Sequence, residues 1–255
     1  MSEVRPAIAG DERWVLAYEE GPGQVSGPVG MRVSVGRSLL VGREGDLPLG
    51  VDVYDKGVSR RAVEITATPA GWDVTVSNSN GAVLHAWGQA PVQLTGRQQL
   101  IWPRIALRIL NGDRSASGPG SRLHWVIFEA DQIPVTPDGA HVSANTTSRT
   151  FTPKPPPPLT PEQLAALEVV FAEHLQWPPP VLAKAAKLGT AARRLGISES
   201  GVQERLSKAR AKAVALGLPH AGGLVDPEYL YALVRAGFVA PPRTRMPRSE
   251  QPWPG

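Results

Sequence analysis

Cysteine is missing from this sequence of 255 residues. The chain therefore has no disulfide framework, no zinc site with thiolate ligands and no cysteine nucleophile. Long apolar runs are missing too: no stretch of about 18 apolar residues occurs, so we expect no membrane-spanning helix. The first residues, Met1–Pro6, include an acidic residue and lack the apolar core of a signal peptide. By elimination we expect a cytoplasmic protein.

Motifs of common catalytic and cofactor sites are also missing. There is no Gly-x-x-x-x-Gly-Lys-Ser/Thr loop, no Gly-x-Ser-x-Gly elbow and no His-Glu-x-x-His. Asp52 and Asp55 occur near Val51 and Val53 in the sequence and are interpreted as the exposed face of a strand or turn rather than as a catalytic pair. The histidines are interpreted as structural or surface groups, since they are scattered without ligand spacing at positions 85, 124, 141, 174 and 220. We therefore expect no enzyme, no metal site and no cofactor.

Proline, in contrast, is abundant, with 26 residues in the chain. Six of the ten residues from 152 to 161 are proline, a composition typical of a stiff polyproline II spacer. The preceding residues, 142–150, are polar and show no periodicity. We interpret 132–158 as a Thr/Pro-rich interdomain linker. The alternative is a proline-rich ligand for the aromatic groove of another domain.

The hydrophobic period differs on the two sides of this linker. Before it, apolar residues alternate in 62–67, 72–76 and 104–110, and turns with Gly, Pro and Asn separate short runs. This pattern is typical of an all-β sandwich or barrel. After it, apolar residues recur every three or four positions, as in Leu164, Leu167 and Phe171. We expect a mainly β domain over 1–131, a small all-α domain over 159–239 and an unfolded tail over 240–255.

Periodicity and caps predict three helices in the second domain. Thr160 and Gln163 predict a capping box before the first helix, with Pro161 as its first residue. The second carries the buried stripe Val202, Leu206, Ala209 and Ala213, and a short third helix is expected at 227–236. Positive charge concentrates here: residues 1–158 hold 15 basic and 15 acidic side chains, whereas residues 184–212 hold 8 basic and 2 acidic ones, a net charge of +6.

Three short pieces of the first domain resemble the forkhead-associated (FHA) domain, over roughly residues 14–130. They are Val41-Gly42-Arg43, Val58-Ser59-Arg60-Arg61 and Ser77-Asn78-Ser79-Asn80-Gly81, in that order. The resemblance implies a β-sandwich that binds phosphothreonine peptides. Arg43 and Ser59 would hold the phosphate, Asn80 would bond the peptide backbone, and Ser79 and Arg60 would lie beside it.

Such residues suit a phosphate dianion, which favours a planar guanidinium together with hydroxyl and amide donors. One position departs from the family pattern. The histidine of the family falls at Ala62, and in the family that histidine braces the loop that carries the serine.

The second domain contains a segment, Thr190–Leu206, that is similar to the helix-turn-helix of sigma-factor region 4 and of response-regulator output domains. Lys184–Leu195 would be its first helix, Gly196 would end that helix and Ser198 would cap the next, the recognition helix. Candidates for contacts with base edges are Ser200, Gln203 and Glu204. Candidates for contacts with DNA phosphates are Arg193, Arg194, Arg205, Lys208, Arg210 and Lys212. The alternative is an ordinary solvated face.

Together these features predict a phosphothreonine-dependent transcriptional regulator in Ser/Thr kinase signalling. Its expected partners are a Ser/Thr kinase, double-stranded DNA and a phosphothreonine protein, with no membrane partner. A phosphothreonine in the chain's own linker, at Thr146, Thr147, Thr150 or Thr152, is the other candidate ligand. Two alternatives remain: a phosphopeptide adaptor whose helices bind a protein instead of DNA, and a structural protein with a degenerate FHA fold.

Overall fold

The computed structural model describes residues 12–21, 24–25, 27–51, 54–112, 122–130, 156–178, 180–218, 222–240, 246 and 249–251. The chain divides into two compact units, which are described separately. Unit 1 comprises residues 1–86, 91–135 and 246–255, and unit 2 comprises residues 87–90 and 136–245. Of the predicted linker, only 156–158 are described, without regular structure, so its four candidate phosphothreonines lie outside the described residues.

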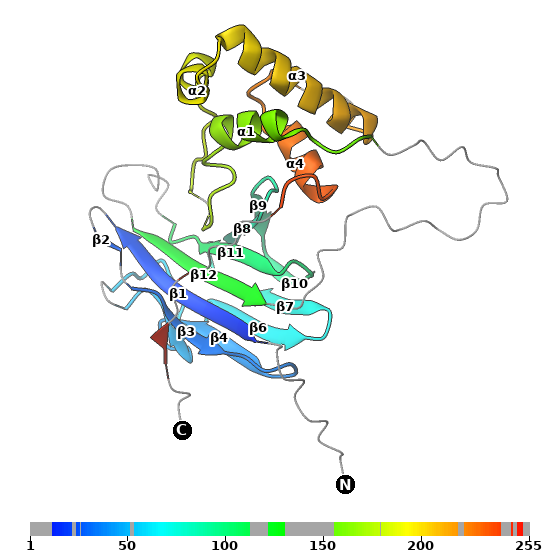
Figure 1. The fold of residues 1–255 in the computed structure, drawn as a ribbon. Coiled ribbons are helices and arrows are strands. Elements are labelled where there is room, and N and C mark those ends of the chain that lie inside the picture. Colours follow the sequence, from blue (N-terminus) through cyan, green and yellow to red (C-terminus); the bar gives the residue numbers. More distant parts are fainter. Residues whose placement is uncertain are drawn as a thin grey trace, which may run out of the picture. The chain divides into compact units, whose positions relative to one another are not determined.

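Unit 1 is built from two β-sheets (Figure 1). The larger has the order β13-β3-β1-β12-β11-β8-β9, with β2 paired to β1, and the smaller has the order β10-β7-β6-β4-β5. All pairs are antiparallel except β13 with β3 and β4 with β5. The strands are β1 (Arg13–Gly21), β2 (Gln24–Val25), β3 (Val29–Arg32), β4 (Ser38–Gly42), β5 (Leu47–Pro48), β6 (Val63–Thr68), β7 (Gly71–Val76), β8 (Ala82–Ala86), β9 (Val92–Leu94), β10 (Gly96–Leu100), β11 (Arg104–Ile109), β12 (Leu123–Ala130) and β13 (Ser249–Glu250).

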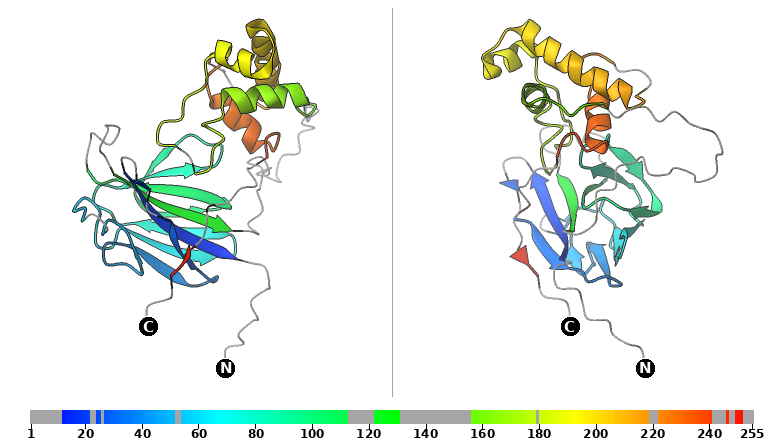
Figure 2. Two further views of the ribbon diagram at one scale, coloured as in Figure 1. Left: turned by 60° about the vertical axis from the view of Figure 1, so that its left-hand side comes forward. Right: turned by 45° about the vertical axis from the view of Figure 1, so that its right-hand side comes forward.

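The core of unit 1 is formed by side chains from both sheets, which face each other as in a sandwich (Figure 2). Ile105, Leu107 and Ile109 of β11 lie in it, as their alternation predicts. From the smaller sheet, Trp72 packs against Phe128 of β12, with ring centroids 5.5 Å apart. The prediction of a mainly β, sandwich-like N-terminal part is therefore confirmed.

The C-terminal tail was expected to be unfolded, but part of it forms a strand. Ser249 and Glu250 form β13, which pairs in parallel with β3, and the Gln251 N–H donates to the Gly30 carbonyl at 2.7 Å. The physical reason is that an edge strand such as β3 offers unpaired backbone groups to any segment that reaches it. Apart from Ala240, Met246 and 249–251, the tail lies outside the described residues.

Unit 2 contains four helices in the described residues: α1 (Pro161–Val170), α2 (Leu188–Leu195), α3 (Glu199–Ala215) and α4 (Glu228–Arg235). The predicted capping box is present, because Thr160 Oγ1 accepts from the Gln163 N–H at 3.3 Å and Gln163 Oε1 accepts from the Thr160 N–H at 3.1 Å. The predicted stripe of α3 is buried in the helical core, and α4 corresponds to the expected third helix.

The helix before the predicted turn starts later than expected, at Leu188 instead of Lys184. Lys187 is extended (φ −60°, ψ 138°), and the Ala186 N–H donates to the Val170 carbonyl at 2.7 Å. This bond to the end of α1 keeps the preceding segment out of a helix. Among the described residues, no helix is long and apolar enough to cross a bilayer.

Candidate functional site

Two loops of unit 1 run side by side beyond the ends of β4 and β6. The Arg43 N–H donates to the Ser59 carbonyl at 3.2 Å, and the Glu44 N–H donates to the Arg60 carbonyl at 2.9 Å. A Cβ atom at Gly42 would lie 2.4 Å from the Arg60 carbonyl oxygen, so this approach needs a glycine. The antiparallel pairing of β4 with β6 thus brings the Gly-Arg and Ser motifs together.

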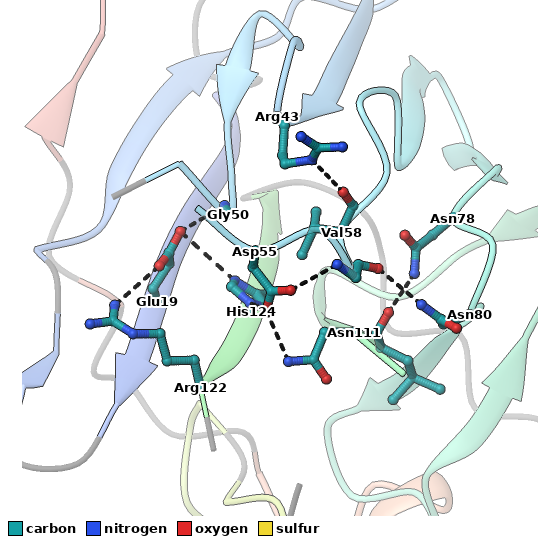
Figure 3. A network of polar contacts seen from close by, with 12 residues as sticks. Glu19, Arg43, Gly50, Asp55, Val58, Asn78, Asn80, Asn111, Arg122 and His124 are labelled. Atoms are coloured by element: carbon teal, nitrogen blue, oxygen red, sulfur yellow. Dashed lines mark hydrogen bonds and ion pairs between the residues drawn. The ribbon is translucent and has the colours of Figure 1, made fainter. Parts of the chain in front are cut away.

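Arg43 is oriented by two contacts. Its Nε donates to the Val58 carbonyl at 2.7 Å (Figure 3), and its guanidinium carbon lies 4.8 Å from the centroid of the Tyr54 ring. Among the described residues, its two Nη groups have no acceptor. The half-buried side chain therefore presents the Nη donors from a fixed position, the arrangement that suits a phosphate or carboxylate.

Ser59 is tied to the loop that follows β7. Its N–H donates to Asn78 Oδ1 at 2.9 Å, and its Oγ accepts from the Ser79 N–H at 3.1 Å. The latter contact uses a lone pair, so the hydroxyl proton can be donated to a ligand. Asn78 is buried and donates from Nδ2 to the carbonyls of Gly81 at 2.9 Å and Leu110 at 2.7 Å. It therefore holds three chain segments together.

Asn80 follows in the same loop, and its side chain is exposed. Its Nδ2 donates to the Gly57 carbonyl at 3.0 Å, which leaves Oδ1 to accept from a ligand (Figure 3). Ser79 is also exposed. The structure therefore joins four of the five residues that the sequence predicts, Arg43, Ser59, Ser79 and Asn80, through hydrogen bonds across neighbouring loops.

Arg60, the fifth, has a different partner. Its Nε lies 3.2 Å from Glu44 Oε1, and the two side chains are 70% and 62% exposed. An ion pair this exposed contributes little, typically about 0–1 kcal/mol. Arg60 is therefore a rim residue that can change partner, and it is not held toward Ser59.

Ala62 occupies the position of the family's histidine and braces the loops only through its backbone. Its methyl group is buried in the core of unit 1. Its N–H donates to the Val41 carbonyl at 2.9 Å, and its carbonyl accepts from the N–H groups of Ser77 and Asn78, both at 2.9 Å. No polar side chain is supplied at this position.

A second polar cluster lies next to these loops (Figure 3). Asp55 Oδ2 lies 2.8 Å from His124 Nε2 and accepts from Asn111 Nδ2 at 3.0 Å. The interpretation of Asp55 as part of an exposed face is therefore wrong: its side chain is only 22% exposed, because the loop turns it toward β12. Asp52 lies outside the described residues.

Sequence reasoning missed Asp55, Asn78 and His124 as members of this site. One signal was present, since alternation along β12 places His124 on the core face with Val126 and Phe128. No local pattern links it to Asp55, which is 69 positions away in the sequence. Only the arrangement of the strands brings the two side chains together.

In unit 2, α2 and α3 are joined by the turn 196–198. Gly196 is left-handed (φ 65°), and Ser198 Oγ accepts from the Gly201 N–H at 3.1 Å, as expected for the end of one helix and the cap of the next. Val202 is buried in the helical core. The candidates for base contacts are all exposed near the start of α3: Ser200, Gln203 and Glu204.

The candidate phosphate-binding cations of unit 2 are only partly available. Lys208 Nζ pairs with Glu204 Oε1 at 2.7 Å, Arg210 Nη1 donates to the Gly222 carbonyl at 2.9 Å, and Lys212 Nζ donates to the Pro158 carbonyl. Arg193 and Arg194 are exposed and Arg205 is half-buried. The hollow at the start of α1 and α3 is lined by Glu162 and Glu204 as well as by Arg205 and Lys208, so this surface carries both signs of charge.

No protein-family model matches the chain, and no curated protein matches it. Solved structures similar to part of this chain include FHA domains that align with 45–46% of it. The FHA-1 domain of Rv1747 from Mycobacterium tuberculosis is 14% identical, with 46% of this chain and 98% of that one covered and a TM-score of 0.26. The FHA domain of CT664 from Chlamydia trachomatis is also 14% identical, with 45% and 95% covered and a TM-score of 0.29.

A third neighbour is the FhaA FHA domain, solved in complex with the intracellular domain of Rv3910. It is 21% identical, 46% of this chain and 99% of that one are covered, and the TM-score is 0.28. At such scores the likeness assigns neither family nor function to this chain. The part of the protein that these comparisons leave without a neighbour includes all four helices of unit 2.

Proposed function

We propose that unit 1 binds a phosphothreonine peptide and that the protein acts as a binding module in phosphorylation-dependent regulation, not as an enzyme. The observation that carries the proposal is the state of Arg43. Its Nε donates to the Val58 carbonyl and its guanidinium lies over the Tyr54 ring. Its Nη groups donate to none of the described residues. Because the guanidinium is already positioned, less entropy is lost when an anion binds.

The groups around Arg43 support a phosphate better than a carboxylate. Ser59 adds a hydroxyl donor, and a phosphate dianion has three acceptor oxygens for such donors. Asn80 can bond an extended peptide that passes over the loop, since its Oδ1 is free to accept. The preference for threonine over serine comes from the motif resemblance, so the test must compare the two residues.

The test is a pull-down with a degenerate phosphothreonine peptide library, followed by calorimetry on an enriched peptide and on its phosphoserine and unphosphorylated forms. We expect binding of the phosphothreonine form and none of the unphosphorylated form. Arg43→Ala should weaken binding at least about tenfold, since a hydrogen bond to a charged group contributes about 1.5–3 kcal/mol. Arg97→Ala is the matched control, because Arg97 pairs at the surface with Asp73 at 2.8 Å. Equal binding by Arg43→Ala and the control would reject the proposal.

The phosphothreonine ligand can be part of the same polypeptide. Thr146, Thr147, Thr150 and Thr152 are close in sequence and are candidate sites for a Ser/Thr kinase. We propose that one of them, when phosphorylated, docks on Arg43 of its own or a neighbouring chain. Replacing all four by alanine should then abolish self-association that depends on the kinase. Unchanged self-association in that variant would leave only a separate protein as the ligand.

A second proposed function, for unit 2, is binding of double-stranded DNA. The turn 196–198 with its caps supports it, as do the exposed side chains Ser200 and Gln203 at the start of α3. The pairing of Lys208 with Glu204 argues for a weaker electrostatic contribution than the net charge of the segment implies.

Salt dependence separates DNA binding from its alternative. Contacts with about five phosphates should give a slope of about −4 to −5 when the logarithm of the association constant is plotted against that of the salt concentration. Arg193→Ala together with Arg194→Ala should reduce the slope by about 2. The absence of binding at low salt would favour an adaptor whose helices bind a protein.

A further inference from the structure

Arg43, Ser59, Ser79 and Asn80 form the proposed phosphate pocket. Its two long polar side chains, Arg43 and Asn80, both depend on one short segment, residues 54–58. The Gly57 carbonyl accepts from Asn80 Nδ2 at 3.0 Å, and the next carbonyl, that of Val58, accepts from Arg43 Nε at 2.7 Å. Tyr54, at the start of the segment, lies under the Arg43 guanidinium. The position of this segment therefore determines where the donors of Arg43 and Asn80 point.

Asp55 holds the segment in place with both its side chain and its backbone. Its Oδ1 accepts from the Gly57 N–H at 2.8 Å, its carbonyl accepts from the Val58 N–H at 3.2 Å, and its own N–H donates to the Gly50 carbonyl at 3.0 Å. Its Oδ2 accepts a hydrogen bond from Asn111 Nδ2 and makes a second one with His124 Nε2 (Figure 3). Partial burial opposes ionisation, yet hydrogen bonds from Asn111, His124 and Gly57 keep the pKa of Asp55 below its ordinary value.

The side-chain partners of Asp55 belong to the larger sheet or follow one of its strands: His124 lies on β12, and Asn111 follows the end of β11. His124 on β12 is fully buried, and its Nδ1 lies 3.8 Å from Glu19 Oε1 on β1. The same Glu19 oxygen accepts from the Gly50 N–H at 2.6 Å, and Glu19 Oε2 lies 3.4 Å from Arg122 Nη1. Asp55 thus connects the loop segment 54–58 to the buried side chain of His124 on β12.

Resting on the proposed function, we propose that Asp55 is a positioning residue for the phosphate pocket. Through His124 and Asn111 it fixes the Gly57 and Val58 carbonyls, and through them the side chains of Asn80 and Arg43. Asp55 does not touch the ligand. Asp55 thereby ties the loop to β12. Ala62, at the position of the family's histidine, contributes only backbone hydrogen bonds.

The decisive variant is Asp55→Asn, which keeps the size of the side chain but offers one oxygen where the carboxylate offers two. One of the bonds from Gly57, His124 or Asn111 must then meet an NH₂ group instead of an acceptor. We expect phosphopeptide affinity to fall about tenfold or more, as for the loss of hydrogen bonds to a charged group. Asp73→Asn is the matched control, since Asp73 pairs with Arg97 on the smaller sheet away from the pocket. It should leave affinity unchanged.

The readout specific to positioning is made without peptide, on the full chain. The Arg43 Nε–H and Asn80 Nδ2–H₂ signals in ¹H–¹⁵N NMR spectra should shift and exchange faster in Asp55→Asn, while the Trp72 indole signal of the core stays unchanged. His124→Ala removes the donor to Asp55 and should shift the same signals. His124→Gln, whose Nε2 can still donate to Asp55, should leave them closer to their positions in the unmodified chain. Should Asp55→Asn unfold, Asn111→Ala takes its place, because it removes one donor and leaves the carboxylate.

The outcomes separate this inference from the proposed function. Shifted Arg43 and Asn80 signals with weakened peptide binding support both. Shifted signals in a protein that binds no phosphopeptide reject the function but support the bracing by Asp55. Unchanged signals in Asp55→Asn, or in Asn111→Ala where that variant is used, overturn the inference whatever the peptide does.

Discussion

At the scale of single residues, the proposed phosphate pocket depends on a few donors that the described residues of unit 1 leave unused. Ser59 provides one of them, the proton of a hydroxyl whose lone pair is already bonded to the Ser79 N–H at 3.1 Å. Arg43 provides the Nη donors. Both side chains also take part in contacts between loops, Arg43 through the Val58 carbonyl and Ser59 through the Ser79 N–H.

We predict that Ser59→Ala weakens phosphothreonine-peptide binding by about 1.5–3 kcal/mol, the range for a hydrogen bond to a charged group. The free energy of unfolding should change little, because the Ser79 N–H that loses its acceptor is exposed to water. Calorimetric titration and urea unfolding measure the two effects. Ser77→Ala is the control in the same exposed loop and should bind as the unmodified chain does. Equal affinities of the two variants would contradict the prediction.

A second residue-scale prediction concerns His85, which is buried on β8 with its ring 5.2 Å from that of Trp125. Burial, and then the charge of Arg108, lower the pKa of His85 to about 4. The pKa is about 6.5 in the unfolded chain, so between these values the unfolded state binds more protons. The stabilisation is complete above about pH 6.5 and decreases as the pH falls toward 4.

From pH 7.5 to pH 5 this difference amounts to about 2 kcal/mol of unfolding free energy. Urea unfolding at the two pH values should show that loss in the unmodified chain and a smaller loss in His85→Gln, whose side chain does not titrate. A variant that keeps the full pH dependence would show that other groups cause it.

At the scale of elements, periodicity predicted the strands well because alternation is a local property. The runs 62–67, 72–76 and 104–110 correspond to β6, β7 and β11, and the stripe of α3 is buried as expected. The start of α2 was mispredicted because a tertiary bond, from the Ala186 N–H to the Val170 carbonyl, competes with helix formation there. Local propensity contains no information on such a bond.

The prediction at this scale concerns Gly57, in the loop before β6. A Cβ atom at Gly57 would lie 1.8 Å from the Asn111 carbonyl oxygen, so Gly57→Ala must push these segments apart. We expect a loss of about 1–3 kcal/mol in the free energy of unfolding, as for an overpacked site. Urea unfolding measures it. Gly27→Ala is the control, because nothing lies within 4 Å of a Cβ atom there, and equal stability of the two variants would argue against close contact.

At the scale of the whole molecule, the described residues of the proposed phosphate pocket belong to one unit. They lie between positions 43 and 80, and the described groups that brace them lie between Glu19 and His124. The core behind them is likewise formed by residues from Val15 to Ala130. The helical core forms a second cluster.

We therefore predict that a chain truncated after Val135 binds the phosphothreonine peptide with an affinity within about threefold of the full chain. Its stability should be somewhat lower, since the short pairing of β13 with β3 is lost. Calorimetry on both chains tests this. Loss of binding on truncation would mean that the pocket needs groups from residues 136–255.

The sequence by itself determined the β character of the first part, the helical character of the second, the caps at Thr160 and Ser198, and the motif that contains Arg43, Ser59 and Asn80. These features depend on neighbours within a few positions. Only the tertiary structure decided that Arg60 pairs with Glu44 and that Asp55 is held by His124. The physical reason is that a hydrogen-bond partner is selected by which strands pair and how their side chains face, and the distance along the chain has no bearing on that choice.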